Sequence, residues 1–292
     1  MTALSYSKTL FPFQSKWLTI DGNKIHYIDE GTGNIILFSH AAIGSSFMYR
    51  EFFKILRTNF RCIAMDYPGF GLSQEADSYT FSIASQARVL QTFIEELGLT
   101  NITLLGHDSP SGLVVAMWRP ELVRALILTD TQIFPTPEYP KIHTMLNIVG
   151  SGLFQRLNAG SNFLVKGTMN FGIRTRKLSA AEKQQYYAIH HSPKRRRAIC
   201  QVLHSIRAEH QLMSDLKAGF EHQLNGKPML MIYGEHDPVQ QLGIPDRIKG
   251  MVKNAELHFV KGEGHFPHEG QPKCMSAIIE QWLKRVSSNT IN

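Results

Sequence analysis

The sequence predicts an α/β fold in which helices cover both faces of a mainly parallel sheet. Apolar runs typical of buried strands alternate with amphipathic helical segments along most of the 292 residues, and parallel strands need such helical crossovers. The alternation is interrupted from about Phe134 to about Phe220, where helical segments occur without a strong buried strand. A chain of this length can bury a large core and carry an insertion. We therefore expect one α/β core with a helical cap.

Residue spacing assigns the elements that precede the cap. Apolar and polar residues alternate around Asp21-Gly22 in residues 16–31, which predicts a hairpin. Continuous apolar runs then predict buried strands, and apolar residues at helical spacing predict the helices between them. Strands are expected within 34–40, 60–73, 101–108 and 124–131, and helices within 48–59, 83–99 and 113–123.

The same alternation resumes after the cap. A strand is expected within 227–238, followed by a helix, a strand within 255–265 and a final helix over 275–286. The predicted organisation is a first core part at 1–133, the cap at 134–220 and a second core part at 221–292. Open α/β sheets bind ligands beyond the carboxyl ends of their strands, and the cap is expected to lie there.

Composition restricts the partners and the compartment. The formal net charge is +7, but the densest basic run, at 193–198, is one helical turn long and is interpreted as a solvated helix face, so no nucleic acid is expected. Cys62, Cys200 and Cys274 are odd in number and far apart, which suggests neither a disulfide framework nor a zinc site. Without a signal peptide or an apolar run of about 18 residues, we expect a cytoplasmic protein with no membrane partner, as a monomer or homodimer.

A small-residue turn stands between a predicted strand and a predicted helix. In this "GHDSPSG" segment, Asp108 occupies the tip, where a strand-turn-helix nucleophile would be presented. A nucleophile in such a strained turn needs neighbours that are small or that sacrifice no backbone hydrogen bond. Gly106 and Ser111 are small, and Pro110 lacks an N–H that would have no partner in the first turn of the helix. If Ser109 were the nucleophile, a histidine would fall on a position that requires a small residue. Asp108 is therefore the preferred nucleophile.

Five segments together carry a family resemblance: "FSHAAIGSSFMYREF", "DYPGFGLS", "LLGHDSPSG", "YGEHDPV" and "GEGHFPHEGQP". Over nearly its whole length the chain resembles α/β-hydrolases of the haloalkane dehalogenase and epoxide hydrolase group. The resemblance implies an α/β-hydrolase fold with the cap inserted after the sixth strand. It also implies a catalytic triad in the chain order nucleophile, acid, histidine, here Asp108, Asp237 and His265, with Asp130 as an alternative acid because some haloalkane dehalogenases carry theirs at that strand end.

A carboxylate nucleophile suits attack on a saturated carbon. Asp108 would be ionised at neutral pH and would form an alkyl ester, which a water deprotonated by His265 would hydrolyse. Backbone N–H groups of Ser109 and Ala42 are the expected oxyanion donors. Water and three side chains suffice for this chemistry, so no cofactor or metal is expected, and the partner is a small, largely apolar substrate.

The leaving group stays open between two alternatives. Haloalkane dehalogenases typically hold the halide with a tryptophan beside the nucleophile and with a second donor. In this sequence the corresponding positions are Ser109 and Ala42. The "HAAI" loop also lacks the glycine and proline that are usual in this group. Gln132 or a cap asparagine could substitute. An epoxide hydrolase would need a cap tyrosine as proton donor, and the candidates are Tyr139, Tyr186 and Tyr187. A third reading is a non-catalytic, ligand-binding α/β-hydrolase homologue.

Overall fold

An eight-stranded sheet forms the centre of the protein. The computed structural model describes residues 4–289, and the strand order is β1-β2-β4-β3-β5-β6-β7-β8. β2 pairs antiparallel with β1 and β4, whereas the pairs from β4 through β8 are parallel. The strands are β1 (Lys16–Ile20), β2 (Asn23–Glu30), β3 (Ile35–Ser39), β4 (Arg61–Met65), β5 (Ile102–His107), β6 (Val123–Thr129), β7 (Met229–Gly234) and β8 (Ala255–Val260). The predicted mainly parallel sheet is confirmed.

The predicted hairpin forms at the edge of this sheet. β1 and β2 are joined by Asp21 and Gly22, which both have positive φ values, of 47° and 75°. Two consecutive residues with positive φ are what a tight two-residue hairpin turn requires, and Asp-Gly supplies them at low cost.

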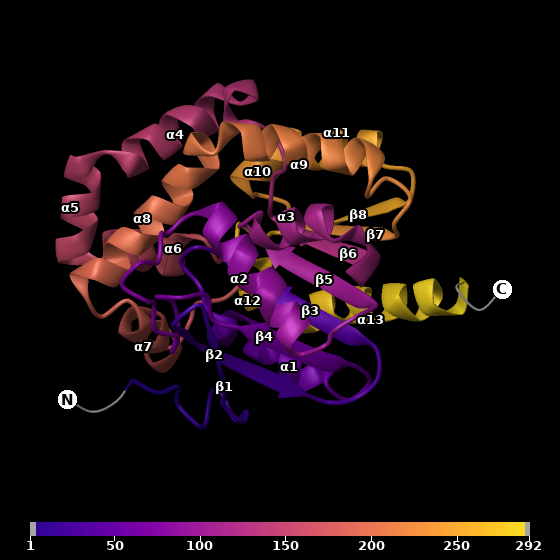
Figure 1. Ribbon diagram of the computed structural model, residues 1–292, viewed down its shortest axis with the longest axis horizontal. Coiled ribbons are helices and arrows are strands. Elements are labelled where there is room, and N and C mark those ends of the chain that lie inside the picture. Colours follow the sequence, from indigo (N-terminus) through magenta and orange to yellow (C-terminus); the bar gives the residue numbers. More distant parts are fainter. Residues whose placement is uncertain (1–3, 290–292) are drawn as a thin grey trace.

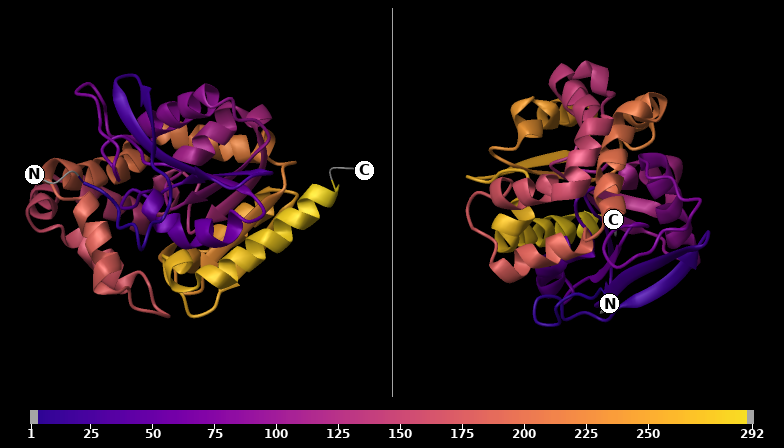
Figure 2. Two further views of the ribbon diagram at one scale, coloured as in Figure 1. Left: turned by 90° about the horizontal axis from the view of Figure 1, so that it is seen from below. Right: turned by 90° about the vertical axis from the view of Figure 1, so that its left-hand side faces the viewer.

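Helices cover both faces of the sheet (Figures 1 and 2). α1 packs against α13, and α2 packs against α3. The core helices are α1 (Arg50–Leu56), α2 (Ile83–Glu96), α3 (Ser111–Trp118), α10 (Pro238–Gln241), α11 (Ile244–Met251), α12 (Pro267–Gly270) and α13 (Pro272–Asn289). The helix predicted over 113–123 ends at Trp118, because Pro120 cannot continue it and starts a short 3-10 turn before β6.

The cap is inserted after the sixth strand, as predicted. Its helices are α4 (Pro140–Gly150), α5 (Gly152–Ser161), α6 (Phe163–Phe171), α7 (Ala180–Ile189), α8 (Pro193–Ala208) and α9 (His210–His222). α8 packs against α4 and α5. Within residues 4–289, every helix is too short or too polar to cross a lipid bilayer.

One detail of the cap differs from the prediction. The basic run at 193–198 is not entirely a solvated face, because the Arg195 side chain is buried and its guanidinium donates to the carbonyl oxygens of Gly71 and Ser73 at 2.6 and 2.7 Å. The interpretation is therefore wrong for Arg195, which fastens α8 to the core.

Candidate active site

Asp108 lies at the tip of a strained turn between β5 and α3. Its φ of 60° is in the left-handed region, which few residues other than glycine adopt. The backbone N–H of Asp108 donates to the carbonyl oxygen of Thr129 at 3.2 Å, which ties the turn to the end of β6. The side chain is one-quarter exposed, at 23%. This geometry lifts the carboxylate above the end of the sheet and leaves it accessible.

The tightest steric constraint in this turn is not the predicted one. A Cβ at Gly106 would meet no atom closer than 3.9 Å, so the backbone there has room for alanine as well as glycine. A Cβ at Gly112, in contrast, would lie 2.9 Å from Cβ of Ser39. Glycine is needed at 112 because α3 packs directly against the end of β3, a close approach that the strand-turn-helix pattern alone does not specify.

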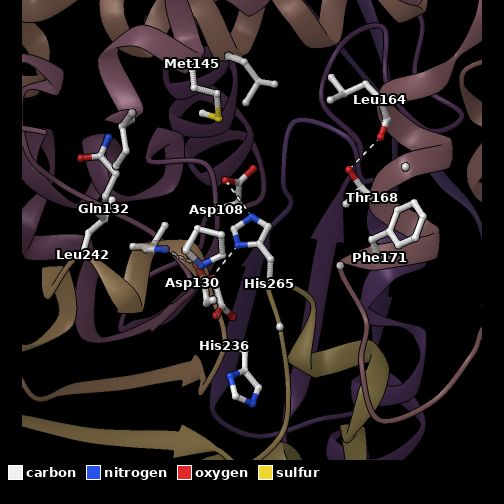
Figure 3. A pocket seen from close by; sticks show the side chains of 18 of the residues that line it. Asp108, Asp130, Gln132, Met145, Leu164, Thr168, Phe171, His236, Leu242 and His265 are labelled. Atoms are coloured by element: carbon white, nitrogen blue, oxygen red, sulfur yellow. Dashed lines mark hydrogen bonds and ion pairs between the residues drawn. The ribbon is translucent and has the colours of Figure 1, made fainter. Parts of the chain in front are cut away.

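Three side chains from separate core segments meet at the carboxyl end of the sheet (Figure 3). His265 lies between β8 and α12, with Nε2 3.3 Å from Oδ1 of Asp108 and Nδ1 2.8 Å from Oδ2 of Asp237. Asp237 is buried and caps α10, where its Oδ1 accepts from the N–H of Val239 at 2.5 Å. The two oxygens of Asp237 are thus held from opposite sides, which orients the imidazole.

Asp130 occupies a place next to this group rather than within it. Asp130 lies close to both partners: one of its oxygens, one oxygen of Asp237 and a ring nitrogen of His265 lie within 4.8 Å of one another. Among the described residues, no other group of three side chains of metal-ligating type lies this close together. Asp130 Oδ1 accepts from the N–H of Gly234 at 2.8 Å. Burial, and then the charge of Asp237, raises the pKa of Asp130 well above its ordinary value. A protonated Asp130 can share its proton with Asp237, so the group is better explained as a hydrogen-bonded acid pair than as a metal site.

Electrostatics favour a charged imidazole in the free enzyme. Burial would lower the pKa of His265, but the charges of Asp237 and Asp108 outweigh it and raise the pKa well above its ordinary value. Burial likewise works to raise the pKa of Asp237, yet its interaction with His265 lowers it. Asp237 therefore stays ionised, and His265 stays protonated while both carboxylates carry their charge.

The predicted oxyanion donors lie on two backbone segments, Ala42 in the loop after β3 and Ser109 in the turn after β5. The N–H of Ala42 and the carbonyl of Ala41 belong to the same peptide unit. This carbonyl accepts from Nδ1 of His40 at 2.8 Å and from the N–H of Gly44 at 2.9 Å. Since C=O and N–H of a trans peptide point in opposite directions, these bonds direct the Ala42 N–H away from them. His40 is itself fixed, because its Nε2 accepts from another backbone N–H at 3.0 Å. A buried histidine thus shapes this loop without the family's usual glycine and proline.

The second expected donor is partly engaged. The N–H of Ser109 lies 2.6 Å from the carbonyl oxygen of His107, so it would have to share or leave this contact to meet an oxyanion. The Ser109 hydroxyl does not face the pocket; it lies 2.9 Å from Oγ of Ser111, which in turn donates to Gln86 at 2.7 Å. This supports Asp108 rather than Ser109 as the group presented to a substrate.

The carboxylate faces a pocket of about 610 Å³ between core and cap. Its walls are mostly apolar and come from α4, α6, α8 and the α10 region, with Met145, Leu164 and Phe171 visible in Figure 3. Gln132, just after β6, is a buried polar residue of this wall. It is 7% exposed, its Oε1 accepts from the N–H of Phe134 at 2.7 Å, and its Nε2 has no hydrogen-bond partner among the described residues. Such a buried, unused amide donor is costly unless a ligand or water meets it.

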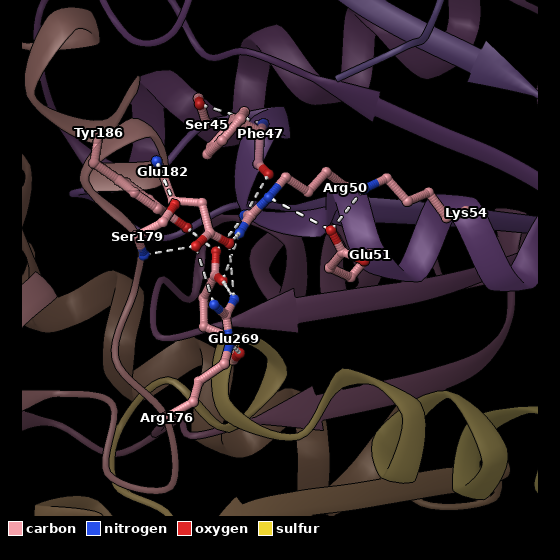
Figure 4. Close-up of polar contacts among 10 residues, drawn as sticks. All are labelled: Ser45, Phe47, Arg50, Glu51, Lys54, Arg176, Ser179, Glu182, Tyr186 and Glu269. Atoms are coloured by element: carbon pink, nitrogen blue, oxygen red, sulfur yellow. Dashed lines mark hydrogen bonds and ion pairs between the residues drawn. The ribbon is translucent and has the colours of Figure 1, made fainter. Parts of the chain in front are cut away.

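None of the three predicted tyrosines lines this pocket, which corrects the expectation of a cap proton donor. Tyr139 accepts from Arg247 at 3.2 Å, and Tyr187 packs against the core without reaching the cavity. Tyr186 is fully buried and donates to Oε1 of Glu269 at 2.5 Å. Tyr186 thus belongs to an ion cluster that connects α1, α7 and α12 (Figure 4). The cluster consists of Arg50, Arg176, Glu182, Tyr186 and Glu269.

Two buried histidines pack beside His265, and the sequence assigned neither of them a place in the site. His107 and His268 lie beneath His265 with ring centroids 4.6 Å apart, and burial lowers the pKa of both well below the ordinary value. They are neutral aromatic packing groups, so they add no positive charge next to His265. A third histidine, His236, lines the pocket.

Comparisons with known proteins agree with this architecture. Residues 34–272 match the family model described as alpha/beta hydrolase fold. The chain is 31% identical over 285 residues to haloalkane dehalogenase 2 of Mycobacterium tuberculosis (strain ATCC 25618 / H37Rv), covering 94% of this chain and 96% of the relative. It is 26% identical over 273 residues to a cis-3-alkyl-4-alkyloxetan-2-one decarboxylase of Shewanella oneidensis, covering 88% of this chain and 84% of the relative.

Solved structures show the same fold. The crystal structure of haloalkane dehalogenase DbeA from Bradyrhizobium elkani USDA94 superposes with a TM-score of 0.85 at 19% identity, covering 95% of this chain and 99% of that one. The crystal structure of a putative ancestral haloalkane dehalogenase superposes with a TM-score of 0.84 at 21% identity, covering 94% of this chain and 99% of that one. From the extent of the family match and the near full-length similarity, the chain belongs to the alpha/beta hydrolase fold family, in its haloalkane dehalogenase-like group.

Proposed function

We propose that the protein hydrolyses a small apolar haloalkane through an alkyl ester on Asp108. The observation that carries this proposal is the double contact of His265, 3.3 Å from Asp108 and 2.8 Å from Asp237, at the edge of an apolar pocket. The similarity to haloalkane dehalogenases along almost the whole chain supports the same reaction class.

The first step uses Asp108 alone. Its carboxylate oxygen attacks the carbon that bears the halogen, a carbon–oxygen bond forms, and the halide leaves with the bonding electrons. The product ester is neutral, so one of the two charges that raise the pKa of His265 disappears. The pKa of His265 then falls, and the imidazole can lose its proton to solvent.

The second step uses the neutral imidazole as a base. Nε2 of His265 removes a proton from a water molecule, which attacks the ester carbonyl while backbone N–H groups of Ala42 and Ser109 stabilise the oxyanion. The ester bond breaks, and the departing alkoxide takes the proton of the newly added hydroxyl and leaves as the alcohol. Asp108 is restored as a carboxylate and His265 keeps the proton from water, as in the starting state; the net proton is the one that His265 lost to solvent in the first step. The net reaction converts haloalkane and water into alcohol, halide and a proton.

Gln132 is our candidate for the donor that holds the departing halide. It supplies an unpaired buried N–H group on the wall that also contains Asp108, and the side chains of Ser109 and Ala42 offer no such donor. Gln132→Leu should slow cleavage of the carbon–halogen bond roughly 10- to 100-fold, because a hydrogen bond to a charged group is lost. Pre-steady-state halide release measures this; an unchanged rate would reassign the donor.

The two other interpretations have weaker support. An epoxide hydrolase would need a tyrosine in the pocket, and Tyr139, Tyr186 and Tyr187 lie elsewhere. A non-catalytic ligand-binding protein would have no use for a carboxylate held at a positive φ beside His265.

Trapping of the intermediate tests the mechanism. His265→Ala incubated with 1-bromohexane should release one equivalent of bromide and gain a hexyl group on the peptide that contains Asp108, as read by mass spectrometry. The native enzyme should turn over without accumulating the ester. Asp108→Ala should release no bromide, whereas Ser109→Ala, which keeps its backbone N–H, should retain turnover.

Each alternative gives a different result. Diol formation from 1,2-epoxyhexane without bromide release would support an epoxide hydrolase, and saturable binding without any product would support a ligand-binding protein. Normal turnover by His265→Ala would exclude the proposed base.

A further inference from the structure

The cap carries an excess of positive charge that the whole-chain value conceals. Residues 134–220 contain 13 lysines and arginines against 4 aspartates and glutamates, a net charge of +9, whereas the rest of the chain has −2. Residues 139–181, which include α4, α5 and α6, contain six basic residues and no acidic residue. The positive charge of the protein is therefore concentrated in the cap, and three of these six basic residues, Lys141, Arg156 and Lys166, belong to α4, α5 and α6.

The same helices expose most of the large apolar side chains that the protein leaves in solvent. Eight such side chains are exposed among the described residues, and six of them belong to α4, α5 and α6. Leu153 and Phe171 are 70% and 82% exposed. Contiguous apolar surface of this kind on a folded chain usually marks an interaction site.

Each of the three helices presents basic and apolar residues on its outer side. On α5 the exposed residues Leu153, Arg156 and Leu157 recur at helical spacing, i, i+3 and i+4. We call the exposed set on α4, α5 and α6 the cap face. It consists of Lys141, Met145, Ile148, Leu153, Arg156, Leu157, Phe163, Lys166 and Phe171.

Contacts connect the three helices that carry the cap face. A groove runs between α4, α5 and α6 and is lined by residues of all three helices, among them Met145, Phe154 and Leu164. The rings of Phe154 and Phe163 join α5 to α6 with centroids 5.0 Å apart. In Figure 1, α4 and α5 form the upper left outline of the molecule, on the side opposite the end of α13.

We propose that the cap face docks on the surface of an anionic lipid bilayer. Amphipathic helices with basic and large apolar residues bind at the interface, where apolar side chains enter the acyl boundary and cations meet lipid phosphates. Lys141, Arg156 and Lys166 form no ion pair with any described residue, so their charges are available. A second copy of the chain fits less well, because a symmetric contact would bring two acid-free basic surfaces together.

Docking would place the pocket mouth at the membrane. Met145, Phe163 and Phe171 belong both to the cap face and to the pocket wall, so an apolar substrate dissolved in the bilayer would enter beside them. This consequence rests on the proposed function; the docking does not. It also departs from the expectation of no membrane partner, which the lack of a spanning segment had favoured.

Vesicle flotation without substrate tests the docking separately from hydrolysis. The native protein should float with vesicles of equal parts phosphatidylcholine and phosphatidylglycerol but not with phosphatidylcholine alone, and added salt should release it. The variant Arg156→Gln/Leu157→Ser removes one cation and one apolar side chain from α5, outside the pocket wall. It should bind anionic vesicles about tenfold or more weakly.

A matched control removes the same kinds of side chain elsewhere. Lys253→Gln/Phe259→Ser changes an exposed cation and an exposed aromatic residue outside the cap, and it should bind like the native protein. Failure of the native protein to bind anionic vesicles, or an equal loss in both variants, would overturn the proposal. A native dimer that the α5 variant converts to monomers, without vesicle binding, would assign the cap face to a second copy instead. Far-UV circular dichroism verifies that both variants are folded.

Discussion

At the scale of single residues, the two buried carboxyl groups next to His265 have different charge requirements. In the proposed mechanism Asp237 is the anion that orients and stabilises the imidazolium, whereas burial and Asp237 itself favour a protonated Asp130. Asp237→Asn should therefore lower kcat on the order of 10³- to 10⁴-fold, as loss of an orienting acid does in other triads. Asp130→Asn resembles the protonated acid and should change kcat little.

Steady-state halide release from both variants measures this difference, with urea unfolding as a check on folding. The reverse ranking of the two variants would make Asp130 the orienting acid. A loss in both would mean that the pair acts as one unit that cannot be divided by residue.

The contact between His265 and Asp108 should make stability depend on pH. Burial opposes a charged imidazole, but Asp237 and Asp108 raise the pKa of His265 above about 6.5, the value in an unfolded chain. A raised folded-state pKa stabilises the fold fully below the unfolded value, and this stabilisation is lost as the pH rises through the folded value. Asp108→Asn should thus reduce the free energy of unfolding most near pH 6 and less at higher pH.

Urea unfolding of native protein and variant across this pH range gives the result. Asparagine tolerates the positive φ at position 108, so backbone strain should not differ between the two proteins. The exposed Asp246→Asn serves as control and should show no such trend. A difference that does not vary with pH would show that the ion pair does not contribute.

At the scale of helices, the ion cluster in Figure 4 connects the cap to the core. Arg50 of α1 is fully buried and binds Glu269 of α12 and Glu182 of α7, the latter at 2.6 Å. Removal of one partner from a buried pair leaves an uncompensated charge, which costs about 3–5 kcal/mol. Arg50→Met should destabilise the protein by this order of magnitude.

Arg57→Met is the matched control, because Arg57 pairs with Glu30 at 3.1 Å on a half-exposed surface. Such pairs contribute about 0–1 kcal/mol. The free energies of unfolding of the two variants should therefore differ by several kcal/mol; similar small values would show that Arg176 alone can neutralise Glu269.

The sequence predicts features that depend on local patterns, but not those that depend on contacts between distant residues. The sheet and Asp108 were predictable because buried parallel strands are continuous apolar runs and the turn after β5 has a local pattern. The order of Asp237 and His265 followed from the family resemblance. Tyr186 was misassigned because its partner, Glu269, lies 83 residues away, and no local pattern tells which face of α7 meets it. His40 and Gln132 depend on similarly distant contacts or on the shape of the pocket.

At the scale of the whole molecule, the cap and the core should unfold together. They share one hydrophobic core, and polar contacts cross between them. Nε2 of His190 donates to the carbonyl oxygen of Ile43 at 3.0 Å, and Oγ of Ser205 accepts from the N–H of Ile83 at 2.9 Å. With these contacts and the ion cluster in place, opening the cap would expose buried apolar surface and unpaired polar groups of the core.

The tryptophans allow a test of this cooperativity. Trp17, Trp118 and Trp282 all lie outside residues 134–220, so their fluorescence reports on the core, while far-UV circular dichroism is dominated by helices, many of which belong to the cap. The two signals should follow one urea transition with the same midpoint. Loss of helical signal at a lower urea concentration than the fluorescence change would show that the cap unfolds first. Arg50→Met, which weakens the connection between the two parts, is the variant in which the two midpoints should begin to separate, whereas Arg57→Met should keep them together.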